Sequence, residues 1–431
     1  MEGLKPPRTT PPSDSDRRGF LFWPISAKLP HVMRFLIPGS HPSLSLAELF
    51  AVAGDNDYSL CSGEAFLVKT DRDPEELQER LGGFVKTGTI VGELSRFNQQ
   101  NAVAVLLPLI QGAAEGTDGK ISFGISVYEL GNKGMAAQIA SDRQRIGLSL
   151  KKALKETGRP VRYVDSKERD LSAVIIRENG LLETGGDWCL IAGTDRVYVG
   201  KTAATQDYKE WGRRDFGRPA ADAKNGMLPP KIARLMVNLA LPETAGASLL
   251  DPFCGSGTVL MEAGVVGVET LVGQDLEAKA VSDTKENLAW AGAAAVISQG
   301  DAQTIHQRLK DPVDAVATEP YLGPPRTKKL TQEEVTKILR ELTKLYDNAF
   351  ASIYKVLKPG GRCVVSFPVF EMENARVFVP MKAALEKIGY KVLPIVPSTA
   401  PDALKERTQN GGLLYRRPDA IVSRDIVVLR K

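Results

Sequence analysis

The apolar positions in the first part of the chain fall into short runs separated by polar turns. Continuous apolar runs predict strands at residues 32–37, 65–70 and 102–107. Apolar positions spaced three or four apart predict helices at residues 43–50 and 73–81. Short mixed elements of this kind make one or two small α/β modules.

A different pattern begins near residue 121. Apolar alternation predicts a strand at residues 123–128, and further strands are expected at residues 161–164 and 173–176. Between them, residues 142–157 have the apolar period of a helix whose other face is basic. This unit is suited to an RNA backbone, the alternative being a helix face that meets only water. The candidate RNA-binding residues are Arg143, Lys151, Lys152, Lys155 and Lys167.

The second half of the chain alternates strands and helices. A polar connection that contains aromatic residues and arginines occupies residues 199–230. A helix then opens at residues 227–231, with prolines in its first turn, where they are tolerated. From Ser248 to the end, the alternation is typical of a doubly wound α/β domain.

One predicted strand of this domain runs into a glycine-rich loop. Leu249 and Leu250 precede Asp-Pro-Phe-Cys-Gly-Ser-Gly-Thr at residues 251–258, and an apolar helix follows. This layout is typical of a nucleotide-binding α/β unit, but the G-x-x-x-x-G-K-[ST] loop of a nucleoside triphosphate site is missing. The loop resembles the S-adenosylmethionine loop of methyltransferases that modify exocyclic amino groups of nucleobases. The alternative is a tight turn without a ligand.

Several residues of this loop are candidates for cofactor binding. Gly255 and Gly257 let the backbone approach a ligand without an intervening Cβ. The start of the following helix offers N–H groups to the methionine carboxylate. We therefore expect Asp251, Phe253 and the two glycines to bind S-adenosylmethionine.

Further polar side chains end the next strands in the expected order. Because ligand groups of a doubly wound sheet lie at the carboxyl ends of its strands, Asp275 is suited to the ribose hydroxyls and Asp301 to the adenine amino group. A fifth strand is expected at residues 362–367, after a Pro-Gly-Gly turn. A lone carboxylate is more often a helix cap or a surface charge, so the prediction depends on the ordered set.

The fourth strand carries the candidate chemistry. Amino-group methyltransferases have [DNS]-P-P-[YF] here, where the first side chain accepts from the amino group and the aromatic ring stacks on a flipped base. This chain has Thr318, Glu319, Pro320 and Tyr321 instead. We expect Glu319 to accept from the amino group, Thr318 to be a further acceptor and Tyr321 to be the stacking surface. The alternatives are a glutamate that caps the loop and a core tyrosine.

Composition limits the class of protein. The 431 residues are 43% hydrophobic and 25% charged, with a net charge of +4 that makes no global case for nucleic acid. Four scattered cysteines and three histidines predict neither disulfides nor a metal site. With no long apolar run or signal-like leader, we expect a soluble, cytoplasmic protein without a membrane partner. Residues 1–30 read as a disordered tail.

Several segments besides the loop at 251–258 match the pattern of a known family. They are Ser166-Lys167-Glu168, Leu171-Ser172-Ala173, Gln206-Asp207-Tyr208, residues 213–219, residues 226–233 and residues 414–419. With these segments the sequence resembles the THUMP-containing tRNA guanine-N2 methyltransferases that act at tRNA position 10. The resemblance runs from about residue 33 to the end.

The resemblance implies a fold and an activity. It implies a ferredoxin-like module at residues 31–115, a THUMP-like RNA-binding domain at 116–200, a linker at 201–225 and a Rossmann-like methyltransferase domain at 226–431. Met227 and Leu228 would join the cofactor site. The implied reaction methylates the N2 amino group of a tRNA guanosine with S-adenosylmethionine. A monomer is expected, and eukaryotic relatives use a small activator subunit.

Two other functions stay open at this point. The same loop and tetrapeptide also serve adenine-N6 and cytosine-N4 methyltransferases acting on DNA or rRNA. The departure at Thr318 and Glu319 also allows an inactive RNA-binding relative. The full set of cofactor residues argues against loss of activity, because a scaffold has no use for an intact cofactor site.

Overall fold

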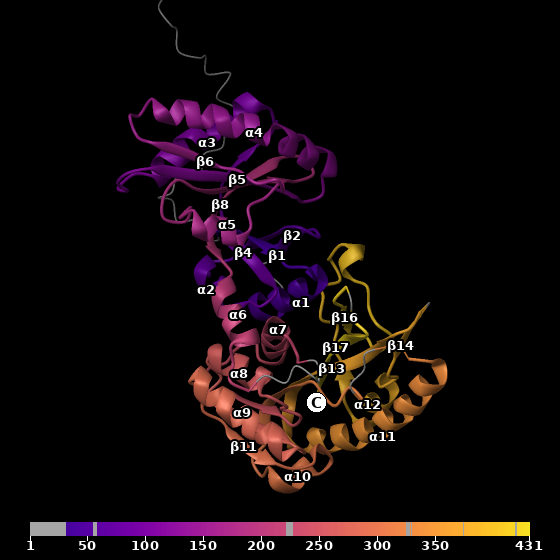
Figure 1. Cartoon of the computed structure of the whole chain (residues 1–431). Helices are drawn as coiled ribbons and strands as arrows, with labels where there is room; N and C mark the ends of the chain where they lie inside the picture. Colours follow the sequence, from indigo (N-terminus) through magenta and orange to yellow (C-terminus); the bar gives the residue numbers. More distant parts are fainter. Residues whose placement is uncertain are drawn as a thin grey trace, which may run out of the picture. The chain divides into compact units, whose positions relative to one another are not determined.

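The computed structural model describes residues 32–54, 58–220, 227–324, 328, 330–373, 375–418 and 420–431. The chain forms two compact units (Figure 1). The first contains Gly88–Thr205 and the segment ending at Phe35, and the second contains Leu36–Thr87 and Gln206–Lys431. The tail expected at residues 1–30 lies outside the described residues, and the domain boundaries expected from the sequence stay a prediction.

The first unit is a mixed sheet with the strand order β8-β7-β5-β6. The parallel neighbours of β5 are β6 and β7, and β7 pairs with β8 antiparallel. Helices α3 and α4 pack on the sheet through one apolar cluster. The elements are α3 (Gln99–Ala113), β5 (Ile121–Glu129), α4 (Lys133–Lys155), β6 (Val161–Val164), α5 (Ala173–Glu178), β7 (Gly186–Ala192) and β8 (Val197–Thr205).

Two strand predictions in this unit are wrong. Residues 102–107 lie in α3, and residues 173–176 lie in α5. Each helix begins at a side-chain cap: the Asn98 side chain accepts from the Asn101 N–H, and the Ser172 hydroxyl accepts from the Ile175 N–H. A short apolar run does not by itself distinguish a buried strand from a helix. The strands predicted at 123–128 and 161–164 are confirmed.

The second unit includes the N-terminal elements, in the strand order β2-β3-β1-β4. They are β1 (Met33–Pro38), α1 (Pro42–Ala53), β2 (Tyr58–Cys61), β3 (Phe66–Lys69), α2 (Pro74–Arg80) and β4 (Phe84–Leu94), and the limit between the units falls within β1 and β4. Buried Glu48 joins this segment to α7 (Pro230–Ala240), because its carboxylate accepts from the Gly82 and Gly83 N–H groups and from the Asn238 amide.

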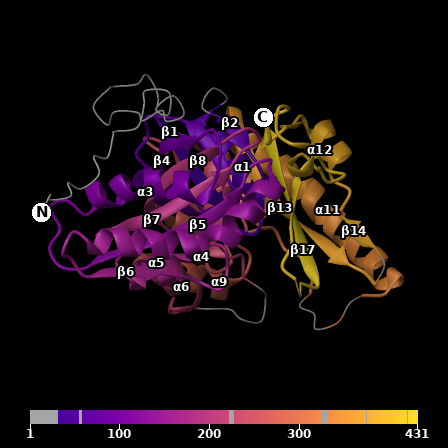
Figure 2. The same cartoon turned by 90° about the horizontal axis from the view of Figure 1, so that it is seen from above.

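The second sheet has the order β11-β10-β9-β12-β13-β17-β15. Its strands from β11 to β13 are parallel, and β17 lies antiparallel beside the long β13 (Figure 2). The strands are β9 (Ser248–Asp251), β10 (Thr270–Asp275), β11 (Val296–Gln299), β12 (Val313–Thr318), β13 (Leu357–Glu371), β14 (Arg376–Phe378), β15 (Lys391–Val392), β16 (Leu413–Tyr415) and β17 (Val422–Arg430). The doubly wound α/β domain and its five predicted strands are confirmed.

Helices cover both faces of this sheet. Leu249 contributes to the cluster with α7, α8 (Thr258–Val265) and α9 (Ala278–Ala291), whereas its neighbour Leu250 contributes to the opposite cluster. That second cluster contains residues of α10 (Ile305–Arg308), α11 (Gln332–Val356) and α12 (Lys382–Ile388). Alternate residues of a strand point to opposite faces, so both faces of the central strands are buried.

Candidate functional site

The strand order reverses between β9 and β12, and ligands of open α/β sheets bind outside the carboxyl ends of strands at such a point. Asp251 ends β9, Thr318 ends β12 and Asp275 ends β10, the other neighbour of β9. The polar residues predicted from the sequence therefore meet at one edge of the sheet.

Asp251 lies buried at the centre of this edge, with 2% of its surface exposed. Its Oδ1 accepts from the Thr318 hydroxyl at 2.6 Å and from the Phe253 N–H at 3.2 Å. Burial raises the pKa of Asp251 to about 7, although both hydrogen bonds favour the ionised form. Thr318 therefore contacts Asp251 directly. Its hydroxyl donates its hydrogen to Asp251 and so does not donate it to a ligand.

The glycine loop presents open space at Gly255. A Cβ built there would meet no heavy atom within 4 Å, whereas a Cβ on Gly257 would lie 3.0 Å from the Thr284 side chain. Both glycines have positive φ, at 54° and 83°. Gly257 is also the N-cap of α8, and no side chain caps this helix. The cradle at Gly255 fits a ligand that lies against the backbone, as S-adenosylmethionine would.

The other predicted cofactor residues border the same loop. Asp275 accepts from the Gly255 N–H at 2.8 Å and from the Glu277 N–H at 3.0 Å, so it shapes the loop directly. Asp301 follows β11, and its carboxylate accepts from the Gln303 N–H at 2.9 Å. Each carboxylate keeps further lone pairs for a ligand hydroxyl or amino group.

Arg218 joins Met227 to the end of the glycine loop. The Arg218 guanidinium contacts the Met227 sulfur and donates to the Thr258 hydroxyl at 2.6 Å. Thr258 is the first residue of α8, and Leu228 is buried in the cluster that contains this helix. The structure therefore places Arg218 and Met227 beside the glycine loop, whereas Leu228 belongs to the core of the unit.

The residues of the tetrapeptide that begins at Thr318 have different surroundings. Pro320 is buried and Tyr321 is 53% exposed, with its carbonyl accepting from the Tyr346 hydroxyl at 2.6 Å. The Glu319 carboxylate accepts from Arg424 of β17 through both oxygens, at 2.6 and 3.1 Å. The Ser366 hydroxyl also donates to it, at 3.1 Å. Tyr321 is thus free to meet a planar ligand, while Glu319 is held in a bidentate ion pair.

Arg424 is a site residue that the sequence reasoning missed. Burial lowers its pKa and the Glu319 charge raises it, with a net rise. A second missed group lies within α8: buried Glu262 accepts from Arg214 at 2.7 Å and from Arg234 at 2.7 Å. The only sequence signal for these pairs was the presence of charges within apolar strand and helix patterns.

The residues predicted to bind RNA lie in the first unit and divide into two kinds. Arg143 is buried, and its guanidinium pairs with Asp165 at 2.7 Å and donates to the Ser166 and Glu168 carbonyls. It therefore shapes the turn at residues 165–168 and is not part of an exposed basic face. The exposed members are Lys152, Lys155 and Lys167, with Lys151 half-buried.

No group of three or more His, Cys, Asp or Glu among the described residues is placed to hold a metal ion. No helix in the described part of the chain is long and apolar enough to cross a membrane.

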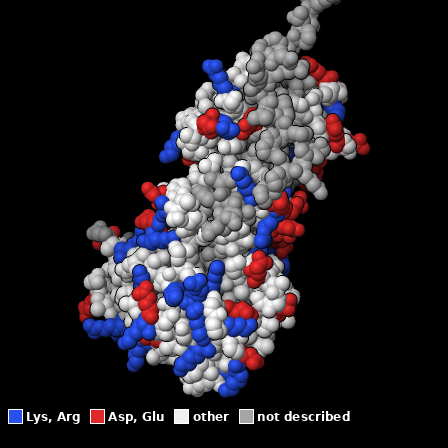
Figure 3. Space-filling model, turned by 180° about the vertical axis from the view of Figure 1, so that it is seen from behind, with Lys and Arg blue, Asp and Glu red and all other residues white. Residues whose placement is uncertain are grey.

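On the face drawn in Figure 3, lysine and arginine side chains gather in the lower part, which belongs to the second unit.

Comparison with known proteins identifies the family of the second half of the chain. Residues 218–377 match the family model described as RMKL-like, methyltransferase domain. Over 189 residues the chain is 35% identical to the tRNA (guanine(10)-N2)-dimethyltransferase of Pyrococcus abyssi. This aligned segment covers 43% of this chain and 48% of that relative. Over 121 residues it is 33% identical to the probable tRNA (guanine(10)-N2)-dimethyltransferase of Methanothermococcus thermolithotrophicus, covering 26% of this chain and 74% of the relative.

The overall fold is also found in a solved structure. TrmN from Thermus thermophilus aligns with a TM-score of 0.51 and 18% identity, over 93% of this chain and 99% of that one. Sheet order, glycine loop and family model together define a Rossmann-like methyltransferase domain, for which S-adenosylmethionine is the cofactor. The chain belongs to the tRNA (guanine(10)-N2)-dimethyltransferase family. It spans about half the length of the first curated relatives that it matches.

Proposed function

We propose that this protein transfers methyl groups from S-adenosylmethionine to the exocyclic N2 amino group of a guanosine in tRNA, at position 10. The observation that carries the proposal is the edge at which Asp251, the Gly255 cradle and the Thr318–Tyr321 segment meet. The names of the relatives favour tRNA guanosine as substrate and two successive transfers.

The side chains suggest how each would act. Asp251, Phe253, Gly255, Gly257, Asp275, Asp301, Met227 and Leu228 would hold the cofactor, which supplies an electrophilic methyl group when bound. Tyr321 would stack on the flipped guanine, and Glu319 would accept from its amino group. Arg424 and Ser366 fix the orientation of Glu319. In-line transfer then depends mainly on positioning.

The test uses the full chain with S-adenosylmethionine labelled in its methyl group and separate pools of tRNA, rRNA and DNA. Label in N2-methylguanosine and N2,N2-dimethylguanosine of the tRNA pool is the expected result, found by nucleoside mass spectrometry. Label in adenine or cytosine would contradict the base assignment. Cofactor binding without any transfer would identify an inactive relative.

The proposal also covers the other domains of the chain, its location in the cell and its partners. Residues 31–115 would form a ferredoxin-like module, residues 116–200 a THUMP-like domain that docks tRNA, and residues 201–225 a linker. The mixed sheet and basic helix α4 of the first unit support an RNA-binding role there. We propose a cytoplasmic monomer. A requirement for a small activator subunit would show as tRNA methylation that appears only when such a subunit is added.

The exposed tyrosine gives the first prediction. Tyr321→Ala is expected to lower turnover by about tenfold, because base stacking on an aromatic ring contributes about 1–3 kcal/mol. Tyr321→Phe keeps the ring and should be nearly silent, since the Tyr321 contact within the protein runs through the backbone carbonyl. Single-turnover methylation of tRNA measures both. Equal loss in the two variants would contradict a stacking role.

The basic face of α4 gives the second prediction. Replacing Lys151, Lys152 and Lys155 together by glutamate should weaken tRNA binding and flatten its salt dependence, because each phosphate contact contributes roughly 0.7–0.9 to the slope. Cofactor affinity should stay unchanged. Titrations at several salt concentrations measure the slope. An unaltered slope would mean that this helix face meets only water.

The raised pKa of Asp251 gives a pH prediction. The unfolded carboxyl ionises near 3.8 and the folded one near 7, so between these values the unfolded state binds fewer protons. Without cofactor, stability should therefore fall as pH rises from about 4 to 7, by about 4 kcal/mol at most, and then level off. Asp251→Asn removes this contribution. Denaturant unfolding across pH should show a shallower slope in the variant, and parallel curves would exclude Asp251 as its source.

A further inference from the structure

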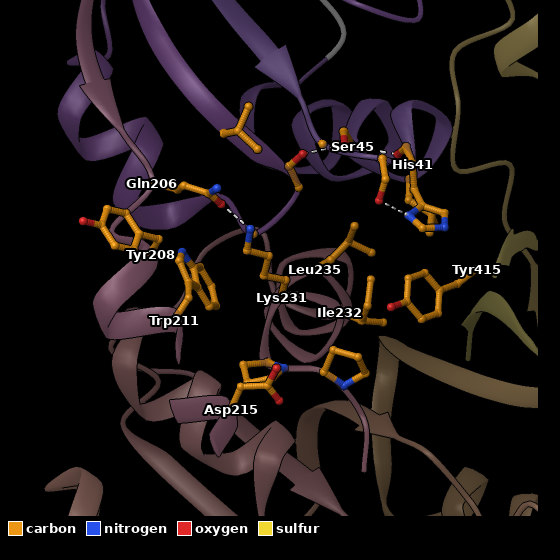
Figure 4. A pocket seen from close by; sticks show the side chains of 18 of the residues that line it. His41, Ser45, Gln206, Tyr208, Trp211, Asp215, Lys231, Ile232, Leu235 and Tyr415 are labelled. Atoms are coloured by element: carbon orange, nitrogen blue, oxygen red, sulfur yellow. Dashed lines mark hydrogen bonds between the residues drawn. The ribbon is translucent and has the colours of Figure 1, made fainter. Parts of the chain in front are cut away.

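A second cavity lies in the same unit as the methyltransferase domain. It holds about 420 Å³, and its walls come from the N-terminal ends of α1 and α7, from α6 (Tyr208–Phe216) and from β16 (Figure 4). No residue of the loop at 251–258 lines it. Cavities of this size are typical of small-ligand sites, and one nucleotide fits such a volume.

Aromatic side chains line two sides of the cavity. Tyr208 and Trp211 of α6 lie on one side of it, and Tyr415 lies on the opposite side (Figure 4). The Arg214 guanidinium lies 4.5 Å from the centroid of the Trp211 ring and fixes it. Phe216 also lines the cavity and is 80% exposed, which is unusual for a phenylalanine. Planar walls of this kind suit a stacked base.

Two opposite charges line the cavity without pairing. Lys231 is half-buried, donates to the Gln206 amide oxygen and lies 5.7 Å from the Trp211 ring centroid. Burial lowers the pKa of Lys231 and raises that of Asp215. Among the described residues, neither side chain forms an ion pair. A ligand that meets both needs an anionic group or acceptor at one end and an N–H donor at the other.

Helix ends add to the attraction for an anion. Both α1, of 12 residues, and α7, of 11 residues, begin at this cavity, and neither is capped by a side chain. Helix N-termini carry partial positive charge that favours phosphate. Each of these two helices begins with a proline, which has no N–H, and the Ile232 and Ala233 N–H groups of α7 already donate to the Pro229 carbonyl. The attraction therefore comes from the helix dipole rather than from a set of backbone hydrogen bonds. Lys231 belongs to the first turn of α7, so its ammonium and the helix end act on the same region.

We propose that this cavity binds an unpaired nucleotide of the RNA substrate other than the methylated guanosine. The phosphate would lie at the α7 end with Lys231, and the base would stack on the aromatic walls with an amino group toward Asp215. This inference rests on the proposed function for the choice of RNA. It also gives a role to residues that the cofactor site does not use, namely Gln206, Tyr208, Asp215, Phe216 and Tyr415.

The cavity is coupled to the methyl-transfer site through one strand pair. Tyr415 of β16 is the direct cross-strand partner of Arg424 of β17, and Arg424 holds Glu319. A nucleotide seated against Tyr415 therefore lies one strand from the residue that orients Glu319. Occupancy of the cavity would position a neighbouring nucleotide for the flipped guanosine.

Two variants of the full chain test the proposal. Phe216→Ala changes an exposed ring, so folding should be unaffected, and Val265→Ala, at the exposed last residue of α8, is its control. Lys231→Gln removes the charge, with exposed Lys382→Gln as its control. Relative to the controls, each variant should weaken binding of a tRNA transcript by about fivefold to tenfold, and Lys231→Gln should also lower the salt slope by about one contact. Affinity for S-adenosylmethionine should not change.

Two further measurements separate the possible results. Ultraviolet crosslinking of the transcript should label the peptide that contains Tyr208, Trp211 and Phe216. Variants equal to their controls in tRNA affinity and slope would overturn the proposal. Weakened binding of guanosine monophosphate with unchanged tRNA binding would also overturn it, because the cavity would then take a free nucleotide. A crosslink at the cavity with no methylated guanosine in wild-type reactions would instead refute the proposed function alone.

Discussion

Glu319→Gln is expected to slow methyl transfer by about a hundredfold to a thousandfold. The amide keeps the shape of the side chain but is a weaker acceptor for the guanine amino group, and a lost transition-state hydrogen bond of this kind costs about 2.7–4 kcal/mol. Affinities for cofactor and tRNA should hardly change, because the contact forms after docking. Single-turnover rates at saturating cofactor and tRNA measure the effect.

The ion pair with Arg424 adds a second effect that must be separated from the first. The side chains of Arg424 and Glu319 are only 5% and 14% exposed, so the glutamine leaves a buried guanidinium without its counter-charge. Breaking such a pair costs about 3–5 kcal/mol of stability. The double variant Glu319→Gln, Arg424→Met removes both charges and should regain most of that stability while turnover stays low. Recovery of turnover together with stability would reduce Glu319 to a counter-ion of Arg424.

The polar residues at the carboxyl ends of the strands in the second sheet could be predicted because short stretches of sequence specify them. Buried apolar residues mark the central strands β9, β10 and β12, and Asp251, Asp275 and Thr318 stand at the ends of these three strands. Parallel strands bring such ends together whatever the loops between them do. The direct contact between Asp251 and Thr318 follows from the adjacency of β9 and β12.

The partner of Glu319 could not be predicted because it depends on tertiary pairing. Arg424 is 105 residues away in the sequence and lies between Ser423 and Asp425 near the start of β17. Its position beside Glu319 depends on the antiparallel register of β17 against β13, where Arg424 lies opposite Pro368. No spacing rule in the sequence specifies that register.

Arg143 shows how a helix face can be misread when its start is misplaced. The sequence pattern began the helix at residue 142, whereas α4 begins at Lys133. With the full helix in view, Arg143 is four residues after Ile139 and three before Ile146, so it lies on the buried side. Its guanidinium there binds the turn at residues 165–168. The exposed lysines are the part of the predicted face that can meet a phosphate.

Gly255→Val is expected to abolish cofactor binding, by at least about a hundredfold in affinity. The new side chain would enter the space in which no protein atom lies within 4 Å of the built Cβ. A ligand displaced from the loop loses several hydrogen bonds to backbone groups, each contributing about 1–3 kcal/mol when left unmade. The same change at Gly257 acts differently, because its Cβ would meet Thr284 rather than the ligand, so the fold itself is disturbed.

Gly255→Val also strains the backbone, and a control variant must separate this strain from the loss of ligand space. Gly255 has a φ of 54°, and a side chain in this region costs about 1–2 kcal/mol wherever it stands. Gly267→Val provides the match, because Gly267 is exposed, has a φ of 81° and also has no atom within 4 Å of a built Cβ. Calorimetric titration with S-adenosylmethionine should find normal binding in Gly267→Val and none in a folded Gly255→Val. Equal affinity in the two folded variants would show that the cofactor does not lie against Gly255.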